Sequence, residues 1–283
     1  GSKMFIEVGK QVKIKDLLFG LIIQSGNDAA VALAEHIAGS EEAFAEMMNI
    51  QARALGMKNS HFLNSTGLPA DGHTTTARDL FILTQAMIRQ FPEHYDWHAI
   101  KKYTFNNIEQ YNRNKLLWRD QTVDGVKTGH TEAAGYCLVA SAKRDDMRLI
   151  SVVLGTPSEE ARATASTKLL NYGFRFYETR TLYKAGKSLT DARVWKSEKG
   201  KMKLGLKKDL VMTIPRGDYK LLKAELEVNS QITAPVSNGQ TLGKLIVQLG
   251  GRTIATRPLV ALENVPEGGW MTRAVDSVRL MME

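Results

Sequence analysis

Apolar residues in the first third of the chain recur every three to four positions, as they do along the buried face of a helix. Residues 12–23 predict one buried helix, and the alanine-rich segment 28–37 predicts a second, closely packed one. The amphipathic segment 41–55 predicts a third. A turn-rich stretch within 64–80 becomes helical from about Thr76, a residue type suited to cap a helix N-terminus.

The period of the pattern changes after residue 121. Two strand-like runs, 136–142 and 148–155, flank the polar stretch 143–146 and predict an antiparallel hairpin. A further helix is predicted over 158–172. Helices followed by a hairpin and a returning helix are typical of an α/β domain rather than an all-helical one.

Short alternating runs fill the segment after Tyr177. They occupy residues 210–215, 222–228, 243–249 and 252–262, and turn residues separate them. This spacing predicts a small all-β sandwich or barrel. We therefore predict a first domain over residues 1–177, a β-rich domain over 178–266, and a terminal helical segment over 267–283.

The terminal segment is amphipathic. One face of its predicted helix carries Trp270, Ala274, Val275, Val278, Met281 and Met282, and the other carries Arg273, Asp276 and Arg279. At about 1.5 Å of rise per residue, this helix is too short to cross a bilayer. Two placements remain open: the helix can lie in a membrane interface with its apolar face down, or it can pack on its own β-rich domain.

Composition narrows the class of protein without deciding its function. Hydrophobic residues make up 43% and charged residues 24% of the chain, as in ordinary globular proteins. The net charge of +8 is concentrated, because residues 180–223 hold 13 Lys and Arg against 4 Asp and Glu. A nucleic acid, an anionic membrane or an acidic polymer would suit this segment, and a solvated surface is the alternative. No aromatic-interleaved nucleic-acid motif accompanies the charge, so we expect no nucleic-acid partner.

Cysteine and histidine usage predicts neither a disulfide nor a metal site. Cys137, the single cysteine, lies in an apolar run and is predicted to pack as a small buried residue. His94 and His98 are four residues apart but lack the glutamate of the HExxH zinc motif. His61 and His73 lie in the turn-rich stretch. We predict surface positions for these histidines, with no metal and no cofactor.

Ser25, Gly26 and Asn27 interrupt two apolar runs. One interpretation is structural: Asn27 caps the alanine-rich helix, and Asp28 complements the positive end of that helix. The other is functional: Ser25 and Asn27 present a hydroxyl and an amide to a cleft. The triplet alone leaves both interpretations open.

A second motif, Lys127-Thr128-Gly129-His130, directly precedes a strand-like run. A cation and a hydroxyl suit a carboxylate, and a glycine at a sheet edge lets a ligand backbone approach closely. These residues predict a site for an extended peptide that ends in a carboxyl group and binds as an added strand.

Ser-x-Asn about one hundred residues before Lys-Thr-Gly is the arrangement of the penicillin-recognising serine enzymes. Together with QSGNDAAVALAEHIAGSEEAFAEMMN, NRNKLLW, VDGVKTGHTEAAGYCLVASA and MRLISVVLG, it makes the chain resemble the low-molecular-mass penicillin-binding proteins. The match is to D-alanyl-D-alanine carboxypeptidases of the penicillin-binding protein 5 type and runs end to end. It implies a transpeptidase-like α/β domain with an antiparallel sheet and helices, a small all-β domain, and a C-terminal amphipathic helix.

The resemblance implies catalytic roles for three residues. Ser25 would relay a proton between a catalytic lysine and the leaving amine. Asn27 would orient that lysine and the substrate amide. Lys127 would bind the terminal carboxylate of a peptide or the carboxylate of a β-lactam.

The resemblance also implies a set of substrate-binding residues around Lys127. Thr128 would share the carboxylate, and Gly129 and His130 would shape the strand edge. Arg113 and Arg162 match basic residues near the family's site and would add positive potential. For each arginine, a structural ion pair is the alternative.

One motif of the resembled family, Ser-x-x-Lys, does not occur, because no serine of the chain has lysine three residues later. The opening GSKMFIEVGKQV resembles a region shortly before the family's Ser-x-Asn motif. The upstream segment is a separate or omitted piece, or it is cleaved or disordered, or the chain is a deliberate fragment. Because an isolated fragment would expose a raw sheet edge, we favour a complete parent enzyme whose N-terminal part lies outside this sequence.

The implied activity is that of a serine-type carboxypeptidase. It would remove the terminal D-alanine from peptidoglycan pentapeptide stems through an acyl-serine intermediate, and β-lactams would acylate it. It would act in the periplasm of a Gram-negative bacterium, attached peripherally to the outer face of the inner membrane by its C-terminal helix. One alternative is a nucleophile-less module that only binds peptidoglycan. The other, a β-lactamase of related fold, is disfavoured by the second domain and the terminal helix.

Overall fold

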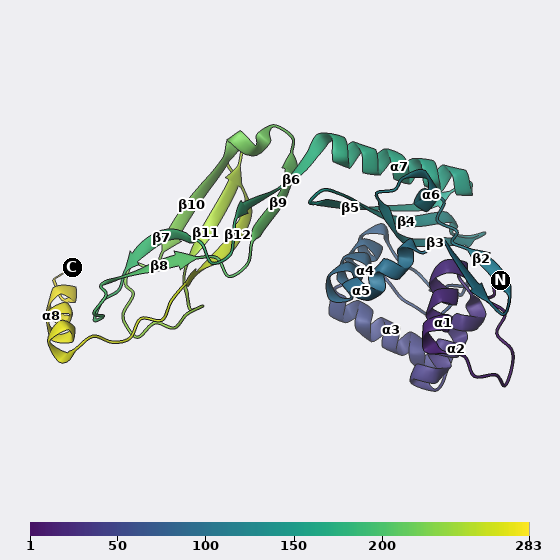
Figure 1. Ribbon diagram of the computed structural model, residues 1–283, viewed down its shortest axis with the longest axis horizontal. Helices are drawn as coiled ribbons and strands as arrows, with labels where there is room; N and C mark the ends of the chain where they lie inside the picture. The colour runs from purple at the N-terminus through teal and green to yellow at the C-terminus, as the bar shows by residue number, and fades with distance from the viewer. Residues whose placement is uncertain (283) are drawn as a thin grey trace. The chain divides into compact units, whose positions relative to one another are not determined.

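The computed structural model describes residues 1–282 and divides the chain into two compact units, Gly1–Arg175 and Phe176–Glu283. Figure 1 shows the helices and strands of each unit. The elements that begin in the first unit are α1 (Ile14–Phe19), the π-helix η1 (Gly20–Gln24), α2 (Asn27–Ala38), α3 (Glu41–Leu55), α4 (Ala77–Gln90), α5 (Pro92–Tyr95), the 3-10 helix η2 (Asp96–Ala99), β1 (Lys102–Phe105), β2 (Ile108–Tyr111), α6 (Leu116–Arg119), β3 (Val123–Thr131), β4 (Gly135–Arg144), β5 (Met147–Thr156) and α7 (Glu159–Phe176).

The first unit is built on an antiparallel sheet in the order β3-β4-β5. The predicted hairpin is confirmed as β4 and β5, which pair from Arg144 opposite Met147 onward. Helices α4 and α5 pack on one face of the sheet through an apolar cluster that includes Tyr95, Val126 and Val139, and α7 runs along the other face (Figure 1). Among the described strands, β3 pairs only with β4, so its outer edge is open.

Capping residues set the ends of two helices, and one of them, Thr76, is the cap that the sequence predicts. Thr76 Oγ1 accepts a hydrogen bond of 3.2 Å from the Asp79 amide at the start of α4. At α3, Ser40 Oγ accepts from the Ala43 amide. Gly56 then ends α3 in the left-handed region at φ 83°, which costs glycine no steric clash.

Two helical predictions near the N-terminus need correction. The helix predicted over 12–23 begins at Ile14 and changes to the π-helix η1 at Gly20. Asn27 does not cap α2, because the N-cap is Gly26 and no side chain bonds there. The carboxylate of Asp28 instead accepts from the backbone amides of residues 4, 5 and 6, and so ties the N-terminal segment to the start of α2.

The second unit is the small all-β domain that the alternating pattern predicts. Its elements are β6 (Tyr177–Tyr183), β7 (Ser188–Arg193), β8 (Lys201–Gly205), β9 (Leu210–Pro215), the 3-10 helix η3 (Asp218–Leu221), β10 (Leu222–Val228), β11 (Thr241–Leu249), β12 (Arg252–Ala261) and α8 (Trp270–Leu280). The strands form a five-stranded sheet, β10-β11-β12-β8-β7, and a two-stranded sheet, β6-β9. Both sheets contribute to one apolar core, which contains Leu204, Leu210 and Leu245.

The terminal helix α8 contacts the β-rich domain through its polar face. Asp276 Oδ2 accepts a 2.6 Å hydrogen bond from the Lys196 amide. Trp270, Met271, Val275 and Val278 of α8 are exposed, from 49% for Val275 to 73% for Trp270. The helix is therefore held to the β-rich domain, as one of the two predicted placements has it, but through its polar face, while its apolar face is left exposed. Within residues 1–282, no helix is both long and apolar enough to span a bilayer.

Candidate active site

Lys127 and Ser25 meet at the open edge of β3. The Lys127 Nζ atom donates to Ser25 Oγ over 2.8 Å and to the Thr128 carbonyl over 2.9 Å. Ser25 follows the π-helix η1 and lies in the left-handed region at φ 62°, a conformation that is uncommon for residues other than glycine. Local strain of this kind, next to a π-bulge, is often found at functional sites.

The surroundings of Lys127 make its ammonium group easier to deprotonate. Burial in the site and, to a smaller extent, the positive charges of Arg113 and Arg162 together lower the pKa of the Lys127 ammonium to about 8. At neutral pH most of the ammonium groups still carry their proton. Lys127 is therefore a cation at pH 7 that titrates within reach of ordinary assay conditions.

Arg113 is the exposed cation of this site. Among the described residues it has no hydrogen bond or ion pair, although it lies close enough to Lys127 to lower the lysine's pKa. Its two neighbours, Asn112 and Asn114, are buried. Asn114 Nδ2 donates to the Gly125 carbonyl of β3 over 2.9 Å, so the loop that carries Arg113 is fastened to the same strand as Lys127.

Sequence reasoning missed the two asparagines. The Asn112 side chain donates to the carbonyls of His98 and Ile100 and accepts from the Asn114 amide. The available signal was the Asn-x-Asn spacing on either side of Arg113. Buried amides of this kind are retained where a loop backbone has no secondary-structure partner.

Arg162 supports the site from behind the strand. It is 4% exposed, and its Nη1 atom donates to the carbonyls of Gly129 (3.1 Å) and Cys137 (3.4 Å). Burial lowers the pKa of its guanidinium, and nearby Glu159 opposes that shift. Its bonds to these two carbonyls brace the Lys-Thr-Gly strand, and its ion pair is the 3.8 Å contact with Glu159.

The remaining residues of the motif lie along β3 rather than before a strand. Thr128 is buried, whereas Gly129 and His130 are exposed. A Cβ built at Gly129 would have Cys137 Cβ, at 4.0 Å, as its nearest neighbour, so space is open above this residue. The His130 ring lies 3.9 Å from the ring of Tyr136, which fixes the histidine beside the open edge.

The structure does not join the Asn27 amide to Ser25 or Lys127. Within the described residues, the Asn27 side chain has no hydrogen bond, and it lines a cavity of about 460 Å³. Other residues that line this cavity are Ser2, Val31, Thr66 and Leu68. Of the three predicted catalytic residues, Ser25 and Lys127 are in contact, and Asn27 stands apart from them.

Two predictions about isolated residues are wrong. Cys137 is only partly buried, and its thiol donates to the carbonyls of residues 134 and 135. His98 is buried rather than on the surface, since it stacks on Tyr95 and its Nδ1 atom bonds the Tyr95 carbonyl at 2.9 Å. Burial lowers the His98 pKa, and Lys127 adds to that effect. The described residues contain no cluster of three or more His, Cys, Asp or Glu that could hold a metal.

Two family models match the chain. The model of the D-alanyl-D-alanine carboxypeptidase family matches residues 1–158, and that of the penicillin-binding protein 5 C-terminal domain matches residues 177–267. Among curated proteins, D-alanyl-D-alanine carboxypeptidase DacA of Escherichia coli K12 is 46% identical over 282 residues. That alignment covers 99% of this chain and 70% of DacA.

Solved structures agree with these matches. Penicillin-binding protein 5 from Haemophilus influenzae superposes with a TM-score of 0.87 at 44% identity, covering 94% of this chain and 78% of that one. Penicillin-binding protein D2 from Listeria monocytogenes, in its ampicillin-bound form, gives a TM-score of 0.56 at 33% identity. The second match covers 61% of this chain and 72% of the other.

Proposed function

Because the chain belongs to the family of serine-type D-alanyl-D-alanine carboxypeptidases, we propose that β3 binds peptidoglycan stem peptides that end in D-alanyl-D-alanine. The observation that carries the proposal is Lys127, a cation on an open edge strand whose ammonium group bonds Ser25. The peptide would add to β3 as an extra strand. Its terminal carboxylate would reach Lys127, Thr128 and the unpaired Arg113.

Proton transfer is the proposed role of Ser25. Its Oγ atom accepts the hydrogen bond from Lys127, so its own proton is free to be donated to another group. Donation to the leaving amine of the terminal D-alanine would complete bond cleavage. Ser25 would in turn take up a proton from the catalytic lysine of the family's Ser-x-x-Lys motif, which does not occur among these 283 residues. The Lys127 ammonium group would stabilise negative charge on the Ser25 Oγ atom in the meantime, because the two groups are already hydrogen-bonded.

The acyl-accepting serine is not assigned to any of these residues, since Ser-x-x-Lys does not occur among the 283. This observation favours a second candidate function for the chain taken by itself: a module that binds stem peptides or β-lactams without cleaving them. The ampicillin-bound form of the Listeria relative supports β-lactam binding by this site.

We further propose that the protein attaches peripherally to a membrane surface in the periplasm of a Gram-negative bacterium. The exposed apolar side chains of α8 support this placement, because the polar face of the same helix is held by the β-rich domain. An amphipathic helix with its apolar face free binds the boundary between lipid headgroups and acyl chains.

Incubation with benzylpenicillin followed by denaturing intact-mass measurement separates the two candidate functions. A covalent adduct on this chain would show that it contains an acylated nucleophile and would overturn the binding-module alternative. Binding of a D-alanyl-D-alanine peptide without any adduct would support that alternative. The absence of both an adduct and peptide binding would contradict both candidate functions.

A further inference from the structure

We infer that Glu159 is a positioning residue of the carboxylate-binding site, an inference that rests on the function proposed above. Glu159 is the first residue of α7. One of its carboxylate oxygens holds the loop that carries Arg113, and the other lies beside the arginine that braces β3. It thus links two cationic parts of the site that are far apart in the sequence.

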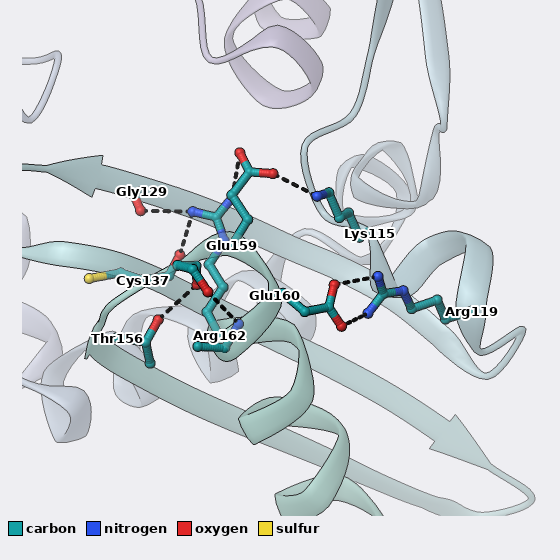
Figure 2. A network of polar contacts seen from close by, with 10 residues as sticks. Lys115, Arg119, Gly129, Cys137, Thr156, Glu159, Glu160 and Arg162 are labelled. Atoms are coloured by element: carbon teal, nitrogen blue, oxygen red, sulfur yellow. Dashed lines mark hydrogen bonds and ion pairs between the residues drawn. The ribbon is translucent and has the colours of Figure 1, made fainter.

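Figure 2 shows this link. Glu159 Oε2 lies 2.8 Å from Lys115 Nζ, and Glu159 Oε1 lies 3.8 Å from the Nη2 atom of Arg162. The first contact is a close ion pair and the second a longer one. A single carboxylate is therefore shared between a lysine of the loop and an arginine one turn further along α7.

Arg162 depends on this carboxylate because the arginine is almost wholly buried. Among the described residues, Glu159 is its one ion-pair partner, and its remaining bonds go to the neutral carbonyls of Gly129 and Cys137. A buried charge that loses its counter-ion is strongly destabilised. Without Glu159, the guanidinium would shift toward solvent and release the Gly129 carbonyl at the binding edge.

Glu159 also positions the loop that carries Arg113, and it does so through Lys115. Lys115 lies two residues after Arg113, and Asn114 between them bonds the Gly125 carbonyl of β3. The Asn112 side chain fastens the loop to the carbonyls of His98 and Ile100, Asn114 fastens it to β3, and Lys115 fastens it to Glu159 of α7. Loss of the Lys115 contact would remove the tie to α7 on the C-terminal side of Arg113, and the Arg113 guanidinium would sample more positions.

The neighbouring Glu160 provides a matched control. It forms a two-pronged ion pair with Arg119, with both distances at 2.7 Å, and both side chains are largely exposed. In the described structure it forms no ion pair with Arg162 or Lys115, although the charge of Lys115 contributes to lowering the pKa of Glu160. Exposed pairs of this kind contribute little to stability, so Glu160→Gln removes one charge at the adjacent position without touching the site.

The first test compares Glu159→Gln and Glu160→Gln with the unmodified protein by calorimetric titration. The ligands are an N-acyl D-alanyl-D-alanine peptide with a free carboxylate and the same peptide as its C-terminal amide. We expect Glu159→Gln to weaken binding of the free carboxylate about tenfold and binding of the amide less than about twofold. Glu160→Gln should change both less than about twofold. Equal behaviour of the two variants would overturn the inference.

The second test needs no ligand. Amide hydrogen exchange is measured on the same proteins for residues 112–116 and 127–131. We expect faster exchange in both segments in Glu159→Gln and in neither segment in Glu160→Gln. Unchanged exchange in Glu159→Gln overturns the positioning role. If the unmodified protein does not prefer the free carboxylate over the amide, the proposed function fails, and the exchange result alone decides the role of Glu159.

Discussion

The Nζ atom of Lys127 donates a 2.8 Å hydrogen bond to the Oγ atom of Ser25, a residue 102 positions earlier in the chain. Each residue alone has an ordinary structural explanation, as a strand lysine and as a residue near a helix start. Their contact brings the two sequence motifs together at one edge of one sheet. The proposed recognition of a carboxylate by Lys127 and the proposed proton transfer by Ser25 would then take place at adjacent atoms.

Substitution of Gly129 tests the binding of a peptide as an added strand. Gly129→Ala should leave the melting temperature nearly unchanged, because the new Cβ has no neighbour nearer than 4.0 Å. Binding of a D-alanyl-D-alanine peptide should fall about tenfold or more, since the methyl group meets the incoming backbone. Thermal melting and calorimetric titration give both quantities. Normal peptide affinity in a well-folded Gly129→Ala variant would argue against the strand-edge mode.

Gly125, two positions before Lys127, gives the contrasting result. A Cβ there would lie 2.7 Å from the Tyr95 hydroxyl, so Gly125→Ala should lower the melting temperature clearly. The pair separates a glycine required by packing from a glycine required by the ligand.

The lowered pKa of Lys127 predicts opposite pH effects on binding and on stability. Binding of a free carboxylate should be constant below pH 7 and should weaken as the pH rises through about 8, where Lys127 loses its proton. The folded pKa lies below the ordinary value of 10.5. Between the two values the unfolded chain binds more protons, so the Lys127 contribution to the free energy of unfolding rises with pH.

Peptide affinity and the free energy of unfolding are each measured from pH 6 to about 10. The Lys127→Met variant, which lacks the titrating group, is the reference for both. Peptide affinity that stays flat across this range in the unmodified protein would contradict the assignment of the carboxylate to Lys127.

Burial of His98 predicts a loss of stability in mild acid. Its pKa is lowered from 6.5, mainly by burial, while Lys127 and Asp124 act on it in opposite directions. The unfolded chain therefore takes up a proton near pH 6.5 that the folded chain refuses, and the free energy of unfolding falls as the pH drops below that value. Urea unfolding at pH 7.5 and pH 5.5 should show a smaller fall for His98→Gln than for the unmodified protein. His94→Gln, at an exposed position, should keep the full fall, and an equal response of both variants would refute the argument.

The exposed face of α8 predicts binding to lipid vesicles. Val278 is 60% exposed on the apolar face, so Val278→Asp should reduce co-sedimentation with phosphatidylglycerol and phosphatidylethanolamine vesicles several-fold. Ser277→Asp adds the same charge at a position whose hydroxyl bonds the Arg273 carbonyl within the helix, and it should have the smaller effect. Equal loss in both variants would point to charge alone rather than to insertion of the apolar face.

The sequence was sufficient where one local rule decides the structure. Thr76 as a helix cap and the β4–β5 hairpin follow from residue type and period alone. It was insufficient where a distant partner decides. Asn27 looks like a cap, but Asp28 binds the N-terminal segment and Gly26 takes the cap position. His98 lies in η2, which packs against β3, and Glu159 pairs with Lys115 of a separate loop, so neither environment follows from spacing along the chain.

The central claim is that Lys127 receives a carboxylate at the edge of β3, and calorimetric titration of Lys127→Met with a free-carboxylate D-alanyl-D-alanine peptide tests it most directly. Lys143→Met, at an exposed position on β4, is the control for loss of a lysine charge. We expect Lys127→Met to weaken binding by about tenfold to a hundredfold, and Lys143→Met to bind like the unmodified protein. Equal affinity of Lys127→Met and the unmodified protein would contradict the account.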